Sequence, residues 1–137
     1  MTINHDLVVL WDNGADKFCL YAVPEDAQYS YIQGLPCITF GMMYENAHFK
    51  GCDVFTLFDR PYMDLLRTIE NAAHCLDGVF RVYDMGDDTD AFVDFTVKDG
   101  RLSVSGQLGA SFSSHTLRFE FEADQTMLHP FRQSLQF

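Results

Sequence analysis

Residues 91–108, with the sequence AFVDFTVKDGRLSVSGQL, carry the strongest structural pattern of the chain. Apolar and polar side chains alternate on both sides of Asp99-Gly100, and this period of two is typical of half-buried strands. Asp-Gly is a residue pair favoured in two-residue hairpin turns. A third alternating segment follows at residues 117–123, so the sequence predicts an antiparallel meander with one buried and one solvated face. Gly106, inside the second strand, predicts a bulge or a close backbone approach.

The segment before the meander, residues 59–76, carries the helical period. Asp59 is expected to cap the amino end of this helix, and Gly78 is expected to stop its carboxyl end. The apolar side chains fall on one stripe of the helix, which predicts that this stripe packs on a sheet: Leu65, Ile69, Ala72 and Leu76.

The first third of the chain predicts further strands. Residues 7–11 and 17–23 are apolar runs on either side of an Asp-Asn-Gly turn at residues 12–14, which favours an N-terminal hairpin. Residues 37–44 and 49–58 are two more strand candidates.

The end of the chain predicts a short helix. Leu128, Phe131 and Leu135 have helical spacing, and we expect the helix proper to begin at Pro130. The side chain of either Asp124 or Thr126 can cap this helix.

These patterns predict the α+β class: an antiparallel, meander-rich sheet with a main helix at about residues 59–76 and a short C-terminal helix, packed mainly on one face. A length of 137 residues fits one domain, so residues 1–137 are expected to form a single unit. Hydrophobic residues make up 47% of the chain and include 13 Phe, which is ample material for its core.

The charge of the chain restricts its partners. Twenty Asp and Glu against nine Lys and Arg give a net charge of −11. Such a field repels nucleic acid and anionic membranes, so neither is expected as a partner, and it attracts a basic protein. The alternative reading is that acidity only keeps a Phe-rich protein soluble.

The four cysteines are widely spaced and form no zinc-binding or redox pair: Cys19, Cys37, Cys52 and Cys75. The first 14 residues contain no Lys or Arg and no long apolar core, so they do not resemble a signal peptide. We therefore expect a cytoplasmic protein with free thiols.

The candidate site is the acidic loop at residues 84–90. It lacks the ligand spacing and the final Glu of a calcium loop, so no metal and no cofactor is expected. A solvated turn is one interpretation of this loop, and a docking patch for a basic partner is the other. The residues expected to contact such a partner are its four aspartates, Asp84, Asp87, Asp88 and Asp90.

Catalysis is not expected. Glu120 and Glu122 alternate with Phe residues, which indicates a solvated strand face and not a pair of catalytic carboxylates. His74 and Cys75 are helix neighbours and point to different faces. An enzyme would need two such side chains brought together in a cleft. A small-molecule binding module, with an aromatic-lined pocket between sheet and helix, is a further alternative.

One family resemblance adds to this interpretation. Leu76-Asp77-Gly78, then Leu102-x-Val104-x-Gly106, and finally the run LRFEFEADQT at residues 117–126 resemble the WapI-type immunity protein family. The likeness covers residues 54–137.

The resemblance implies a small cytoplasmic protein that binds and neutralises a cognate bacterial toxin. The toxin is typically the C-terminal domain of a large secreted or cell-wall protein and is often a nuclease. The matched residues are structural, so the resemblance assigns no contact residue. A nuclease that grips phosphates is commonly basic, so a chain of charge −11 suits it by long-range attraction.

Overall fold

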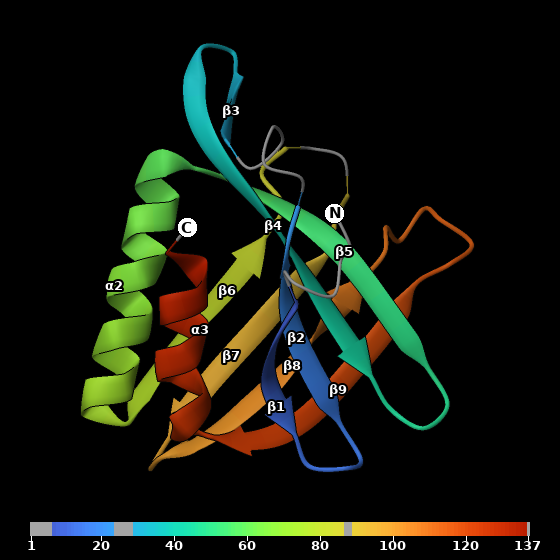
Figure 1. Ribbon diagram of the computed structural model, residues 1–137, viewed down its shortest axis with the longest axis vertical. Helices are drawn as coiled ribbons and strands as arrows, with labels where there is room; N and C mark the ends of the chain where they lie inside the picture. The colour runs from blue at the N-terminus through green and yellow to red at the C-terminus, as the bar shows by residue number, and fades with distance from the viewer. Residues whose placement is uncertain (1–6, 24–28, 87–88, 137) are drawn as a thin grey trace.

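The computed structural model describes residues 7–23, 29–86 and 89–136 and contains two antiparallel sheets with two helices (Figure 1). The first sheet contains β1 (Leu7–Asp12), β2 (Lys17–Ala22), β3 (Tyr29–Ile32), β4 (Leu35–Glu45) and β5 (Lys50–Phe58). The second sheet contains β6 (Asp77–Tyr83), β7 (Phe92–Lys98), β8 (Arg101–Leu108) and β9 (Leu117–Asp124). The helical elements are α2 (Asp59–Cys75), the 3-10 turn η2 (Gln125–Met127) and α3 (Leu128–Leu135). The predicted α+β class, with one main helix and a short C-terminal one, is confirmed.

The long strand β4 organises the first sheet. One edge of β4 pairs with β2 along residues 40–45 and with β3 along residues 35–38, while its other edge pairs with β5 over residues 37–45. β1 extends the sheet beyond β2, as the predicted N-terminal hairpin requires. Because β4 alone runs the full length of this sheet, the shorter strands are held together through it.

The second sheet contains the predicted three-strand meander, β7-β8-β9, and adds β6 next to β7, in the order β6-β7-β8-β9. At the β7–β8 turn Asp99 has φ 52° and Gly100 has φ 80°, which are the left-handed conformations of a two-residue hairpin turn. A Cβ atom on Gly106 would lie 2.3 Å from the carbonyl oxygen of Phe92, so the expected close backbone approach is confirmed. The register between β7 and β8 shows no bulge at this position.

Helix α2 begins and ends differently from the prediction. Phe58, in extended conformation, precedes the helix, and Asp59 is its first residue, so the expected cap at Asp59 is wrong. The helix ends at Cys75 because Leu76 turns to a left-handed φ of 57°; Gly78 lies inside β6. The chain must reverse here because Asp77 already pairs with Lys98. Leu76 is therefore 41% exposed and leaves the otherwise buried stripe.

The C-terminal helix begins at Leu128, two residues before the predicted start at Pro130. The backbone N–H of Thr126 donates to Asp124 Oδ1 at 2.9 Å, so the expected cap at Asp124 is confirmed, and it starts η2. Pro130 is the third residue of α3, where the helix needs no N–H donor.

Phe95 of β7 lies where the layers meet. Its ring centroid is 6.3 Å from that of Phe18 in the first sheet, 4.8 Å from Phe80 in the second and 5.0 Å from Phe131 in α3. Figure 1 shows α2 and α3 side by side next to β6, while the first sheet lies over another part of the second. The helices thus cover one part of the inner face of the second sheet, and the first sheet covers the other part. The outer face of the second sheet carries exposed side chains.

Candidate functional site

Asp84 opens the acidic loop and is directed inward. Asp84 is only 9% exposed. Its Oδ1 accepts from the backbone N–H of Thr56 at 2.9 Å and of Gly86 at 3.3 Å. The N–H of Met85 donates to the carbonyl oxygen of Thr56 at 2.8 Å. The start of the loop therefore joins the end of β6 to the edge of β5.

Asp90, at the other end of the loop, is exposed and is held by the β8–β9 connection. Its carboxylate accepts from the Ser111 hydroxyl, from the Ser111 backbone N–H at 2.7 Å and from Gln107 Nε2 at 3.2 Å. These donors, led by the Ser111 hydroxyl, hold the pKa of Asp90 below its ordinary value. The carboxylate is charged and fixed in direction.

Asp53 of β5 joins the same region and was not predicted. Its Oδ2 accepts from the backbone N–H of Gly109 at 2.9 Å and from the Thr89 hydroxyl at 3.2 Å. The only sequence signal was a lone acidic residue inside a strand-like segment. We call Asp53, Asp84 and Asp90 the acidic rim, because they link β5, the β6–β7 loop and the β8–β9 connection.

The four loop aspartates are thus placed as follows. Asp84 and Asp90 belong to the acidic rim, whereas Asp87 and Asp88 lie outside the described residues. Asp84 is engaged with backbone inside the protein, and Asp90 is the exposed one of this pair. Their assignment as partner contacts stays a prediction.

Asp53→Ala is expected to lower the free energy of unfolding by about 2 kcal/mol, because the Gly109 N–H and the Thr89 hydroxyl lose a charged acceptor. Urea denaturation measures the change. Asp64→Ala is the matched control: this carboxylate is 61% exposed and lies 3.6 Å from Arg67, so its loss is expected to cost no more than about 0.5 kcal/mol. Equal effects of the two substitutions would contradict the proposed role of Asp53.

Asp90 gives a prediction for the pH dependence of stability. A depressed pKa in the folded protein means that the carboxylate stabilises the fold above its unfolded pKa, and that this contribution is lost as pH falls through the lower, folded value. The wild type is therefore expected to be more stable than Asp90→Asn near neutral pH, and this difference in the free energy of unfolding should vanish in strong acid. A difference that grows on acidification would contradict this. Urea unfolding midpoints of both proteins, measured from neutral to acid pH, determine this difference.

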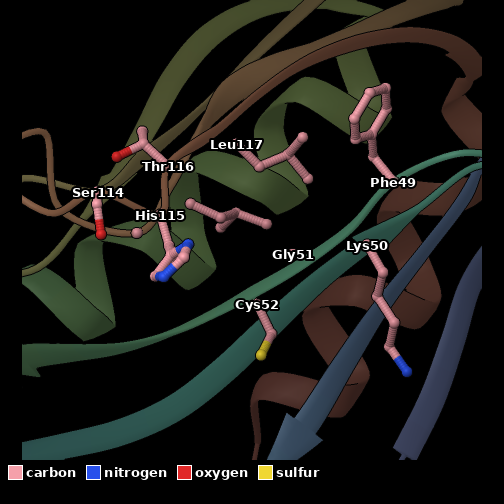
Figure 2. Close-up of a pocket in the computed structure, with 10 residues that line it drawn as sticks. Phe49, Lys50, Gly51, Cys52, Ser114, His115, Thr116 and Leu117 are labelled. Carbon is pink, nitrogen blue, oxygen red and sulfur yellow. The ribbon is translucent and has the colours of Figure 1, made fainter.

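An open groove of about 430 Å³ separates the start of β5 from the β8–β9 connection. Figure 2 shows the β5 residues along one wall and residues 114–117 along the other. This volume suits a small ligand. The helix–sheet interface, where the alternative small-molecule interpretation places a pocket, contains fully buried side chains that include Ile69 and Phe131. The groove side chains of chemical interest are Phe49, Lys50, Cys52, Ser114, His115 and Leu117.

The cysteines differ in accessibility. Cys52, in the groove, and Cys75, at the end of α2, are exposed, whereas Cys19 and Cys37 are buried. Burial also raises the pKa of the Cys19 thiol. Iodoacetamide is therefore expected to modify Cys52 and Cys75 in the native protein and the other two only after unfolding. Peptide mass spectrometry reads the sites, and rapid native labelling of Cys19 would contradict the structure.

The candidate catalytic residues lie on different elements. His74 and Cys75 are exposed near the end of α2, while Glu120 and Glu122 lie on the exposed face of β9, as expected of a solvated strand face. Within residues 7–23, 29–86 and 89–136, no group of three or more His, Cys, Asp or Glu side chains is placed to hold a metal ion.

Neither α2 nor α3, the helices in the part of the chain that the structure describes, has the length and apolar character needed to span a bilayer. Comparison of the chain with protein-family models, with curated proteins and with solved structures finds no significant match.

Proposed function

We propose that this chain is a small cytoplasmic immunity protein that binds a basic bacterial toxin domain and neutralises it by covering its surface. The observation that carries the proposal is the net charge of −11 on 137 residues. A field of this size attracts a basic protein from a distance, speeds the encounter and disfavours anionic partners.

The acidic rim supports the proposal. Backbone and hydroxyl donors already fix the carboxylate of Asp90, so its orientation need not be ordered on binding. A basic domain that meets this end of the molecule finds negative charge in a fixed arrangement.

Inhibition by this route needs no bond chemistry. A nuclease grips phosphates with basic side chains, and an acidic protein that occupies those side chains competes with the nucleic acid for them. Electrostatic attraction brings the two proteins together, and the bulk of the inhibitor then blocks access to the toxin.

The experiment begins with the gene beside the one that encodes this chain. If it encodes a large exported protein, its C-terminal domain is produced and titrated with this chain by calorimetry, and the activity of that domain is assayed. We expect tight one-to-one binding and loss of toxicity on co-expression. A basic neighbouring domain that neither binds this chain nor is inhibited by it would contradict the proposal.

The groove supports a second candidate function, binding of a small ligand between β5 and the β8–β9 connection. Its volume of about 430 Å³ is the specific observation in favour. A fragment library screened by protein NMR is expected to shift the signals of Cys52, His115 and Leu117. Absence of any such shift would exclude this function for the fragments tested.

A further inference from the structure

The strand β5 lies at the edge of the first sheet. Within the described residues it pairs with β4 alone, so its other edge has no partner strand. Backbone groups that point out of such an edge are a template for pairing with another chain, and proteins commonly cover or disrupt them. At the opposite end of the sheet, β1 is interrupted by a bulge between Val9 and Trp11, which disturbs the regular pairing that an added strand needs.

Alternate residues of β5 turn their backbone groups away from β4. In an antiparallel pair, a residue either exchanges both of its backbone hydrogen bonds with its partner or turns both groups outward. Thr56 is of the second kind, because its N–H donates to Asp84 Oδ1 and its carbonyl oxygen accepts from the N–H of Met85. The same parity turns the N–H and carbonyl groups of Lys50 and Cys52 outward.

Carboxylates cover the later part of this edge. The Asp84 carboxylate takes one outward N–H, and Asp53 Oδ1 accepts the next one, from Val54 at 2.8 Å. Across residues 7–23, 29–86 and 89–136, no backbone hydrogen bond reaches the outward groups of Lys50 and Cys52. The edge is thus covered from residue 54 onward and open at its start.

The open start of the edge lies in the groove of about 430 Å³, which residues 50–52 line on one side and residues 114–117 on the other. Leu117 lies against Gly51, since a Cβ atom on this glycine would be 2.7 Å from Leu117 Cδ2. Figure 2 shows Phe49, which is 62% exposed, on the same side of β5 as Leu117. A strand laid along the edge would therefore place alternate side chains against apolar surface.

The groove is continuous with the acidic rim. Asp53 follows the open edge directly, and its Oδ2 accepts from the N–H of Gly109, which lines the groove. Lys50 and His115 also line the groove and are basic, so the local charge is mixed and does not by itself choose the occupant. The unpaired backbone groups do, because main-chain hydrogen bonds supply the affinity when an extended peptide adds to a sheet edge.

We propose that an extended segment of the basic partner adds to the outer edge of β5 as a further strand of the first sheet, an inference that rests on the proposed function. The segment pairs with Lys50 and Cys52. Residues 50–54 span about 13 Å at about 3.3 Å per residue, which suits a segment of about five residues. A second copy of this chain is a poor occupant because two molecules of charge −11 repel each other.

The test uses the full chain and the basic C-terminal domain encoded beside it, with binding measured by surface plasmon resonance. The edge variant is Cys52→Pro, which removes the outward N–H and places the proline ring where the added strand would lie. An edge strand tolerates proline at a position whose N–H faces solvent. The matched control is Cys52→Ala, which changes the side chain and keeps the N–H. Circular dichroism and urea midpoints establish that each variant is folded.

The edge variant is expected to bind about tenfold or more weakly, and the control within about threefold of the wild type. A Cys52→Pro variant that binds as tightly as the wild type would overturn the strand addition and leave the proposed function standing. A basic domain that fails to bind the wild type would instead overturn the proposed function and the inference that rests on it.

Amide hydrogen exchange followed by NMR decides the same question on the unmodified protein, should the proline variant not fold. In the free chain, the amides of Lys50 and Cys52 are expected to exchange fast, and those of Gly51 and Asp53, which face β4, slowly. Binding should slow exchange at Cys52 by about tenfold or more, and unchanged exchange there would overturn the inference. Self-association of the chain in sedimentation that Cys52→Pro abolishes would also overturn it, by assigning the edge to a second copy.

Discussion

Phe95→Ala is expected to lower the free energy of unfolding by about 3–5 kcal/mol, the range for removing a fully buried phenylalanine ring. Phe95 is 0% exposed, and its ring contacts residues of both sheets and of α3. Such a loss is comparable with the whole stability of a small domain, so a large part of the variant should be unfolded at room temperature. Urea denaturation followed by circular dichroism measures it.

Phe112→Ala is the matched control for this prediction. Phe112 is 81% exposed in the β8–β9 connection, so the same chemical change should alter stability by no more than about 0.5 kcal/mol. A Phe95→Ala variant that unfolds at nearly the wild-type urea concentration would mean that Phe95 does not join the layers.

Gly106→Ala is expected to cost about 3 kcal/mol, although it adds a single methyl group. That methyl carbon would lie 2.3 Å from the Phe92 carbonyl oxygen and 2.9 Å from the Val93 Cα atom, which are both backbone atoms and cannot rotate away. The β7 and β8 strands would have to separate, which places the cost at the upper end of the overpacking range.

Thermal unfolding followed by calorimetry tests this prediction. Ser105→Ala, one residue earlier in β8, is the control, because Ser105 already carries a Cβ atom on the outer face. Its expected change is within about 0.5 kcal/mol. If Gly106→Ala were as stable as the wild type, the two strands would have to lie further apart than the structure places them.

The β7-β8-β9 meander of the second sheet could be predicted from the sequence because its information is local. Alternation assigns each residue to a face, and Asp99-Gly100 fixes the turn and with it the register. The division into two sheets could not be predicted, because a period of two says which face is buried and nothing about the partner strand. β4 takes β2 and β3 on one edge, and no local pattern encodes that pairing.

The carboxyl end of α2 also could not be predicted from local sequence alone. Helical periodicity predicts Leu65, Ile69 and Ala72 as buried, and they are. Leu76 has the right spacing, yet it takes a left-handed conformation because β6 starts at the next residue. A tertiary constraint thus ends the helix before its apolar pattern does.

The candidate site was only partly predictable. Asp84 stands in a polar loop and resembles a solvated residue, but its carboxylate meets the N–H of Thr56, 28 residues away along the chain. Glu120 and Glu122 were correctly placed on a solvated strand face. That Tyr83 shares this face with them follows only from the register of four strands, which the sequence does not supply in advance.

We propose that the negative field of this chain recruits a basic partner. Stopped-flow measurement of the association rate with the neighbouring toxin domain tests it most directly. We expect the rate to fall at least about tenfold between roughly 50 and 500 mM salt, because screening shortens the reach of the field. Intact binding at a rate that salt leaves unchanged would contradict the claim.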